Sequence, residues 1–169
     1  GGSRRIPGKN KRLFHGRPII EYSIEAAQKA EIFDRIYVST DDDAIAAISV
    51  AAGARLIKRP YELAQDHIGT QQVMEHTLMT IDPWADFACC IYPTAPMLDP
   101  NKLRHARELM DDKTPYVIPV GTWLRDPGQF YFGNSNAFTF KVALNANGVK
   151  IVWIDPKTEC DINDWNDWH

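Results

Sequence analysis

The sequence has only three cysteines among its 169 residues, and it lacks any long hydrophobic run. Cys89, Cys90 and Cys160 have neither the even number nor the spacing of a disulfide framework or a structural zinc site, so we expect a reducing, cytoplasmic setting. No apolar stretch reaches the length of a transmembrane helix and no signal-peptide pattern is present, so we expect no membrane span. The net charge of −3 provides no broad basic surface, which argues against nucleic-acid binding driven by bulk electrostatics.

The composition instead indicates a globular protein. Hydrophobic residues make up 44% of the chain and aromatic residues 11%, which is enough to bury a substantial core. No repeat, low-complexity segment or long linker interrupts the sequence. We therefore expect residues 1–169 to form one domain.

The first ten residues combine flexible glycines with a cluster of cations. They read Gly1-Gly2-Ser3-Arg4-Arg5-Ile6-Pro7-Gly8-Lys9-Asn10. Glycine lets backbone N–H groups approach an anion closely, and the arginines and the lysine supply positive charge for phosphate oxygens. This pattern predicts an exposed loop that wraps a polyphosphate, whereas on composition alone a basic, disordered tail is the alternative.

Helical and strand patterns alternate along most of the chain. Apolar residues spaced three and four apart predict helices over about 17–30, 41–51, 70–79 and 101–110, and short β-branched or apolar runs predict strands at 36–40, 54–57, 87–92, 116–120, 129–132 and 149–154. Such alternation is typical of βαβ units. The predicted fold is α/β: a doubly wound, mostly parallel, Rossmann-like sheet with helices on both faces, binding its ligand beyond the carboxyl ends of the strands.

The opening loop stands without a strand before it, although a phosphate loop in such a sheet normally follows one. We therefore expect a hydrophobic first strand to precede Gly1 in the protein.

Two further patterns have a structural and a functional interpretation. The triplet Asp41-Asp42-Asp43 could bind a metal or form the acidic pocket of a phospho-accepting regulator, but capping of the helix that follows explains it more simply. Cys89 and Cys90 lie inside a predicted buried strand, where a core role is favoured over nucleophilic catalysis.

Several short blocks, taken together and in order, resemble the sugar-acid cytidylyltransferases, the CMP-sialic acid synthetase family, and most closely its pseudaminic acid branch. Besides the opening loop they are Pro18 to Ala27, Val38 to Asp42, Arg59 to Leu63, Cys90 to Pro96, Gly128 to Tyr131, and Asp161 to Asn163 with Asp167-Trp168. Each block is weak alone, but the ordered set covers nearly the whole chain.

The resemblance implies a reaction and a set of roles. The anomeric hydroxyl of a nine-carbon sugar acid would attack the α-phosphate of CTP, giving a CMP-sugar and pyrophosphate with help from Mg²⁺. Lys9 and Arg4 would be the catalytic cations, and Tyr92, Gln129 and Tyr131 would bind the sugar. The implied nucleotide-binding residues are Gly1, Gly2, Ser3, Asn10, Arg59, Thr70 and Thr94, and the implied metal-binding pair is Asp161 and Asn163.

The chain departs from the family pattern in two places. The second metal-binding aspartate is replaced by Asn163, whose oxygen can ligate Mg²⁺ without adding negative charge, and Asp164 is a candidate to compensate. The segment before Gln129 is short where family members carry sugar contacts and a dimerisation excursion, so we expect missing residues between Val120 and Trp123, while the family predicts a homodimer.

Two other functions remain open on this evidence. One is the related 3-deoxy-octulosonate cytidylyltransferase activity, which shares the opening loop. The other is a non-catalytic nucleotide-sensing or interaction domain on the same scaffold.

Overall fold

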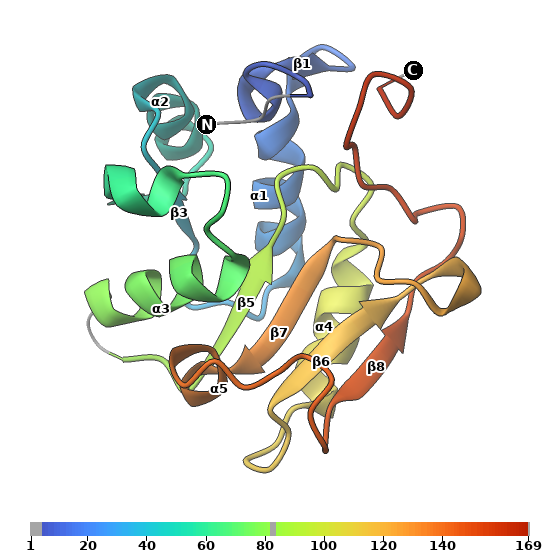
Figure 1. Ribbon diagram of the computed structural model, residues 1–169. Helices are drawn as coiled ribbons and strands as arrows, with labels where there is room; N and C mark the ends of the chain where they lie inside the picture. The colour runs from blue at the N-terminus through green and yellow to red at the C-terminus, as the bar shows by residue number, and fades with distance from the viewer. Residues whose placement is uncertain (1–4, 82–83, 169) are drawn as a thin grey trace.

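The computed structural model describes residues 5–81 and 84–168. Helices and strands alternate along most of this part of the chain (Figure 1). The helices are α1 (Ile19–Ala30), α2 (Asp43–Ala51), α3 (Thr70–Thr80), α4 (Pro100–Leu109) and α5 (Ser135–Thr139), with short 3₁₀ helices η1 (Lys9–Lys11), η2 (Tyr61–Ala64) and η3 (Thr122–Leu124). The strands are β1 (Leu13–Phe14), β2 (Arg17–Pro18), β3 (Tyr37–Thr40), β4 (Arg55–Lys58), β5 (Phe87–Ile91), β6 (Tyr116–Val120), β7 (Phe130–Asn134) and β8 (Lys150–Trp153).

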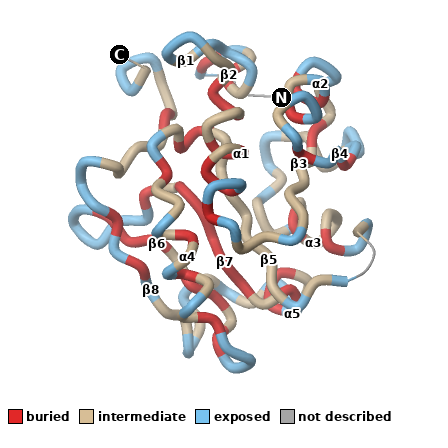
Figure 2. The backbone as a smooth tube through the Cα atoms, turned by 180° about the vertical axis from the view of Figure 1, so that it is seen from behind, coloured by how far each residue is buried: buried red, intermediate tan, exposed pale blue. Residues whose placement is uncertain are grey.

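The largest sheet has the strand order β5-β7-β6-β8. β6 pairs with β8 in parallel, whereas β7 runs antiparallel to both β5 and β6. Figure 2 shows β7 buried along most of its length in the middle of the molecule. β3 and β4 form a separate parallel pair, and β1 and β2 form a small hairpin.

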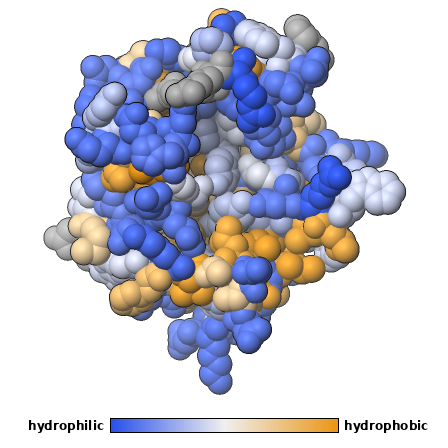
Figure 3. All heavy atoms as spheres, viewed as in Figure 1, coloured by the Kyte–Doolittle hydropathy of each residue, from blue (hydrophilic) through white to orange (hydrophobic). Residues whose placement is uncertain are grey.

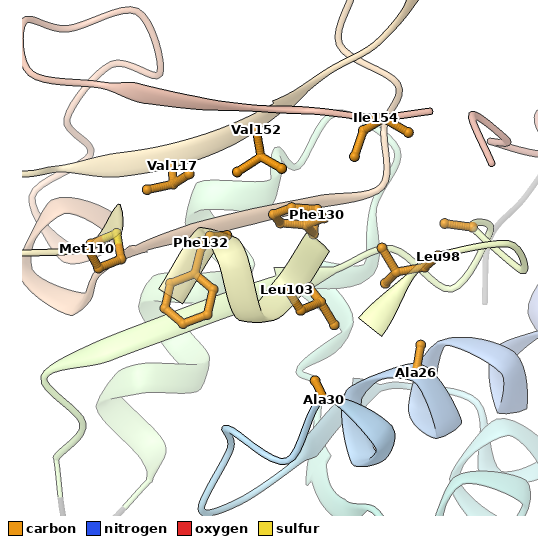
Figure 4. Packing of buried hydrophobic residues seen from close by; sticks show 12 residues of the cluster. Ala26, Ala30, Leu98, Leu103, Met110, Val117, Phe130, Phe132, Val152 and Ile154 are labelled. Carbon is orange, nitrogen blue, oxygen red and sulfur yellow. The ribbon is translucent and has the colours of Figure 1, made fainter. Parts of the chain in front are cut away.

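Helices cover both faces of the four-stranded sheet. On one face α4 and the end of α1 pack on alternate residues of β7, Phe130 and Phe132, and on Val117 and Val152 (Figure 4). On the other face α3 and α5 pack on the intervening residue Tyr131 and on neighbouring side chains. The period of two along β7 thus sends successive side chains into two different cores, and the predicted α/β class with helices on both faces is confirmed.

The four-stranded sheet is mixed, because β7 runs antiparallel to both of its neighbours while the other strands share one direction. Only residues 121–129 connect β6 to β7, and this segment contains a short 3₁₀ turn and no long helix. A parallel neighbour needs a crossover of a dozen or more residues, so a connection of this length turns the chain back beside β6. Sequence periodicity reports burial and not strand direction, which is why it missed the reversal.

Gly133 in β7 makes room for an aromatic pair. A Cβ at this position would lie 2.6 Å from Cδ1 of Tyr116 and 2.7 Å from Cε2 of Phe138. The rings of Tyr116 and Phe138 meet edge to face, 5.0 Å between centroids. The missing side chain therefore lets α5 pack closely on the sheet.

The segment from Cys160 to Trp168 lies beside the N-terminal hairpin. Ile162 packs with Ile6 and Ile19 in a small core in which all three are 0% exposed. The ring of Trp168 meets Phe14 edge to face at 5.7 Å, and the guanidinium of Arg12 lies 4.7 Å from the ring centre of Trp165. Two segments far apart in the sequence are therefore held together at one end of the molecule (Figure 1).

β3 and β5 are each hydrogen-bonded to one neighbouring strand in the pairing of the described residues. The expected strand before Gly1, and the expected missing residues between Val120 and Trp123, stay predictions. Trp123 and Leu124, at the end of the Val120 to Trp123 segment, both have a φ of 60°, which residues other than glycine adopt only at a cost in free energy.

Among the described helices, none has the length and apolar character needed to cross a bilayer.

The acidic triplet caps a helix, as predicted. The carboxylate of Asp42 accepts hydrogen bonds from the backbone N–H groups of Ala44 at 2.9 Å and Ile45 at 3.1 Å. The other oxygen of Asp42 accepts from Lys11 Nζ at 2.7 Å. Asp42 therefore begins α2 and also ties it to η1.

We expect Asp42→Ala to lower the free energy of unfolding by about 1 kcal/mol, because it removes the cap. Asp42→Asn keeps a side-chain oxygen for the cap and loses only an exposed ion pair, so it should cost much less. Chemical denaturation of both variants checks this expectation. Equal losses would mean that the ion pair with Lys11, and not the cap, is what stabilises α2.

Candidate active site

Lys9 lies at the start of η1, directly after the left-handed turn at Gly8. The predicted exposed loop is wrong here, because Lys9 is only 8% exposed and its Nζ donates a hydrogen bond of 2.5 Å to the carbonyl oxygen of Ile162. Packing of Ile6 into the core draws the loop inward and carries Lys9 with it. The charge pattern of the loop did not indicate this burial, because the burial depends on the packing of Ile6, two residues before the turn at Gly8.

The environment of Lys9 shifts its proton affinity. Burial lowers the pKa of the Lys9 ammonium, the carboxylates of Asp161 and Asp167 oppose that shift, and the guanidinium of Arg5 adds to it. Two cations and two carboxylates thus share one small region. The ammonium of Lys9 is held against a backbone carbonyl there, with Asp161 close enough to influence it.

Asp161 is the centre of the polar contacts in this region. Its Oδ1 accepts a hydrogen bond of 2.6 Å from the Thr94 hydroxyl, and its Oδ2 accepts one of 2.6 Å from the Asn163 amide nitrogen. Gly128, whose φ is 63°, leaves room for the side chain of Asp161, because a Cβ at position 128 would lie 2.6 Å from Asp161 Oδ2. The structure thereby brings together the predicted residues Lys9, Thr94, Asp161 and Asn163.

Asn163 also contacts the opening loop. Its Oδ1 accepts a hydrogen bond of 3.0 Å from Nη2 of Arg5, and its backbone N–H donates to Asp167 at 2.8 Å. The amide therefore presents nitrogen to Asp161 and oxygen to Arg5. The sequence indicated Arg5 as one of the cations of the opening loop, but its contact with Asn163 was not predicted.

A cavity of about 530 Å³ lies on the α3 and α5 side of the sheet, and Tyr92 in its wall precedes Thr94 by two residues. In the space-filling view the face is hollowed near its middle, with hydrophobic side chains gathered below the hollow (Figure 3). The cavity brings together the predicted residues Thr70, Tyr92 and Tyr131. Its other walls are Gly69, Gln71, Gln72, Lys141, Ala143 and Leu144.

Three hydroxyl groups, from Thr70, Tyr92 and Tyr131, lie in the wall of the cavity. The Tyr92 hydroxyl is hydrogen-bonded to the Thr70 hydroxyl, and the Tyr131 hydroxyl donates to the carboxylate of Asp126. The two tyrosine rings meet edge to face at 5.8 Å. Burial raises the pKa of Tyr92 to about 12, and burial together with the bond to Asp126 raises the pKa of Tyr131. Both phenols are therefore neutral hydrogen-bonding groups near neutral pH.

Arg59 follows β4 and is bound to the end of β3. Its Nη2 donates 2.6 Å to the carbonyl oxygen of Ser39, and its Nε donates 3.2 Å to the Ser39 hydroxyl. Burial lowers the pKa of its guanidinium, which the neighbouring carboxylate of Asp41 opposes. Arg59 is thus a partly buried cation at the carboxyl end of the β3 and β4 pair, apart from the residues that line the cavity.

Two predicted residues have other surroundings. The side chain of Gln129 is 1% exposed and donates 2.6 Å to the carbonyl oxygen of Thr158, so it holds two loops together. Asn10 lies within η1 and is partly exposed. The predicted residues Gly1, Gly2, Ser3 and Arg4 lie outside the described residues.

Burial raises the pKa of both adjacent thiols in β5, that of Cys90 to about 12. Cys89 packs in the core of α1 and α4, and Cys90 packs in the core of α3 and α5. A thiol in such surroundings is protonated and unreactive. The interpretation of these cysteines as core residues is confirmed.

A divalent ion would find few ligands in the described part of the protein. No group of three or more His, Cys, Asp and Glu side chains there is arranged to hold a metal. Asp161 offers one carboxylate, and the amide of Asn163 would have to turn around to add its oxygen. This set fits Mg²⁺ bound mainly through substrate phosphates, which commonly uses one or two carboxylates.

The fold is that of the nucleotidyltransferases. A solved structure with this fold is that of CMP:2-keto-3-deoxy-manno-octonic acid synthetase complexed with CTP, which superposes with a TM-score of 0.75 at 14% identity over 96% of this chain and 89% of that one. The family model described as cytidylyltransferase matches residues 1–163. The chain therefore belongs to the cytidylyltransferase family.

Curated relatives agree with this assignment. The chain is 34% identical over 142 residues to a pseudaminic acid cytidylyltransferase of Campylobacter jejuni, covering 80% of this chain and 61% of the relative. It is 31% identical over 119 residues to an N-acylneuraminate cytidylyltransferase of Escherichia coli, covering 70% of this chain and 28% of that protein. The resemblance seen in the sequence is confirmed, and the chain spans about three fifths or less of the length of these relatives.

The buried bond of Lys9 leads to a stability prediction. Lys9→Met keeps most of the apolar stem but leaves the Ile162 carbonyl without its donor, so we expect the free energy of unfolding to fall by about 1 to 3 kcal/mol. Lys11→Met, two residues later, removes only a partly exposed ion pair and should cost less than about 1 kcal/mol. Denaturant titration of both variants makes the comparison; losses of equal size would show that the Lys9 bond contributes no more than a surface contact.

Proposed function

We propose that the protein transfers CMP from CTP to a nine-carbon sugar acid, with pseudaminic acid as the preferred substrate. The observation that carries the proposal is the meeting of Lys9, Thr94 and Asp161, together with a cavity whose wall includes the hydroxyl groups of Thr70, Tyr92 and Tyr131. Charged groups suit a triphosphate, and the hydroxyl-lined cavity suits a sugar. Family membership and the curated relatives support the same conclusion.

In the proposed reaction the anomeric oxygen of the sugar acid forms a bond to the α-phosphorus of CTP. The bond from that phosphorus to the bridging oxygen breaks, pyrophosphate leaves with the electron pair, and the hydroxyl proton passes to solvent. Negative charge builds up on the α-phosphate and on the leaving group. Lys9 would release the Ile162 carbonyl and donate to an α-phosphate oxygen, with Arg4 and Asn10 acting on the rest of the nucleotide.

Positioning residues would surround this centre. Thr94 fixes Asp161 through the bond of 2.6 Å. Arg59 directly follows β4, and Thr70 begins α3 and is hydrogen-bonded to Tyr92, which directly follows β5. Nucleotides bind at the carboxyl ends of strands in sheets of this class. The opening loop, with Gly1, Gly2 and Ser3, would supply backbone donors to phosphate.

The cofactor that we propose is Mg²⁺, held by Asp161, by Asn163 after a turn of its amide, and by the phosphates of CTP. When bound, it would neutralise phosphate charge and orient the triphosphate. Asp161 supplies the carboxylate, and Thr94 keeps that carboxylate in one orientation.

The proposed sugar site is the cavity of about 530 Å³, within the usual range for a small-molecule pocket. Tyr92 and Tyr131 would hydrogen-bond to sugar hydroxyl or acylamino groups. Gln129 would support the sugar site indirectly. Its side chain is hydrogen-bonded to the Thr158 carbonyl, and its backbone oxygen accepts a hydrogen bond of 2.9 Å from the N–H of Tyr92. We further propose a cytoplasmic homodimer that binds neither nucleic acid nor membranes.

Pyrophosphate release with CTP and Mg²⁺ tests the proposal directly. We expect release with pseudaminic acid to exceed release with N-acetylneuraminic, legionaminic or 3-deoxy-octulosonic acid. Faster release with 3-deoxy-octulosonic acid would replace the proposed substrate by that sugar. Absence of release with every sugar, in the presence of measurable CTP binding, would support a non-catalytic nucleotide-sensing role.

For the role of Lys9 we expect Lys9→Ala to lower kcat by at least about a hundredfold, because the transition state loses a charge-assisted hydrogen bond at the α-phosphate. The assay is run well below the melting temperature of the variant, since Lys9 also stabilises the fold. Lys11→Ala is the matched control and should retain most activity. A Lys9→Ala protein that is folded and turns over at the normal rate would remove Lys9 from the chemistry.

A further inference from the structure

A relay of hydrogen bonds joins a guanidinium to a carboxylate through a single amide. Arg5 Nη2 donates 3.0 Å to Asn163 Oδ1, and Asn163 Nδ2 donates 2.6 Å to Asp161 Oδ2. Arg5 and Asn163 lie 158 positions apart in the sequence. The packing of Ile6 with Ile162, each adjacent in the chain to one partner of this contact, holds the two segments in register.

As long as no metal is bound, the chemistry of the neighbours fixes the direction of the Asn163 amide. A guanidinium can only donate hydrogen bonds and an ionised carboxylate can only accept them, so oxygen must face Arg5 and nitrogen must face Asp161. An aspartate at position 163 could not make the second of these bonds. It would place two carboxylates side by side and would draw Arg5 into an ion pair.

The neutral amide leaves the charge of Arg5 available. Arg5 is an exposed residue, and its bond to Asn163 uses one of the five N–H groups that a guanidinium carries. A bond to a neutral acceptor is also weaker than one to a carboxylate or a phosphate. Asn163 therefore orients the Arg5 guanidinium, and Arg5 can exchange this bond for one to an anionic ligand.

The charge of the region favours an incoming anion. Arg5 lies near enough to Lys9 for its positive charge to lower the pKa of the Lys9 ammonium. A ligand with several negative charges would relieve this repulsion between cations. Because Lys9 is buried and Arg5 is exposed, the two cations present an inner and an outer contact to such a ligand.

We propose that Arg5 binds the β- and γ-phosphates of CTP, the part that leaves as pyrophosphate, and that Asn163 is the positioning residue that holds the guanidinium ready. The inference rests on the proposed use of CTP and deepens it. In this account the amide at position 163 contributes to nucleotide binding without a metal, by keeping Arg5 free of a competing carboxylate.

Calorimetric titration with CTP and with CMP, both in the presence of EDTA, separates this role from general electrostatics. We expect Arg5→Ala to weaken CTP binding about tenfold or more and to change CMP binding little, since CMP lacks the phosphates in question. Arg5→Lys should give an intermediate loss, because it keeps a charge without the fork. Arg17→Ala is the matched control: its guanidinium lies over Tyr22 and is paired with Glu25, so CTP binding should be unchanged.

A double-mutant cycle tests the positioning role of Asn163. Asn163→Asp should weaken metal-free CTP binding in the wild-type background, and should cost much less in the Arg5→Ala background, because the ion pair it creates needs Arg5. Simple repulsion between the new carboxylate and the phosphates would instead give the same loss in both backgrounds. That additive result would overturn the role of Asn163.

The remaining outcomes are equally distinct. Normal CTP affinity in a folded Arg5→Ala protein would overturn the role of Arg5 and leave the proposed function intact. A wild-type protein that binds neither CTP nor CMP, with or without Mg²⁺, would overturn the proposed function and this inference together.

Discussion

The packing of Ile6, Ile19 and Ile162 is the contact on which the site depends. It is a small cluster, with all three side chains fully buried, yet the bonds of Arg5 and Lys9 to residues 162 and 163 depend on it. Without it the opening loop would have no fixed place relative to the segment that carries Asp161 and Asn163. Burial of three isoleucines, worth several kcal/mol in transfer free energy, offsets the cost of bringing charged groups close to one another.

The cluster also explains why a lysine is buried at the site. Lys9 follows Ile6 by three residues in a tight turn, so its Cα is carried inward when Ile6 packs. The carbonyl of Ile162 then provides the acceptor that a buried ammonium requires. The same isoleucine thus supplies an apolar side chain to the core and a polar backbone group to the site.

Much of the fold could be predicted from the sequence, because helices and strands follow local periodicity. Pro18 before α1, Asp42 before α2 and the apolar runs of β5 and β6 mark boundaries within a residue or two of those in the structure. The direction of β7 could not be predicted in this way, since it depends on the length of a connection. The short α5, at Ser135–Thr139, was hidden in a stretch rich in Gly and Asn that resembles a loop.

The site was predictable in composition but not in contacts. The family resemblance indicated Lys9, Thr94, Asp161 and Asn163, and the structure gathers these residues. The bond from Arg5 to Asn163, the bond from Tyr131 to Asp126 and the inward turn of Gln129 depend on which segments meet in space. Single-sequence patterns carry little information on such meetings across long separations.

The distance along the chain between Lys9 and Ile162, 153 positions, has a consequence for the order of events during synthesis. A ribosome adds about 5 to 20 residues per second, so roughly 8 to 30 seconds pass between synthesis of the opening loop and synthesis of its partner. During that interval the hairpin, α1 and the β3 and β4 pair can form from contacts already available. The bond between Lys9 and the Ile162 carbonyl, in contrast, cannot form on a nascent chain that lacks residue 162, so the proposed nucleotide site would be completed only near the end of translation of this stretch.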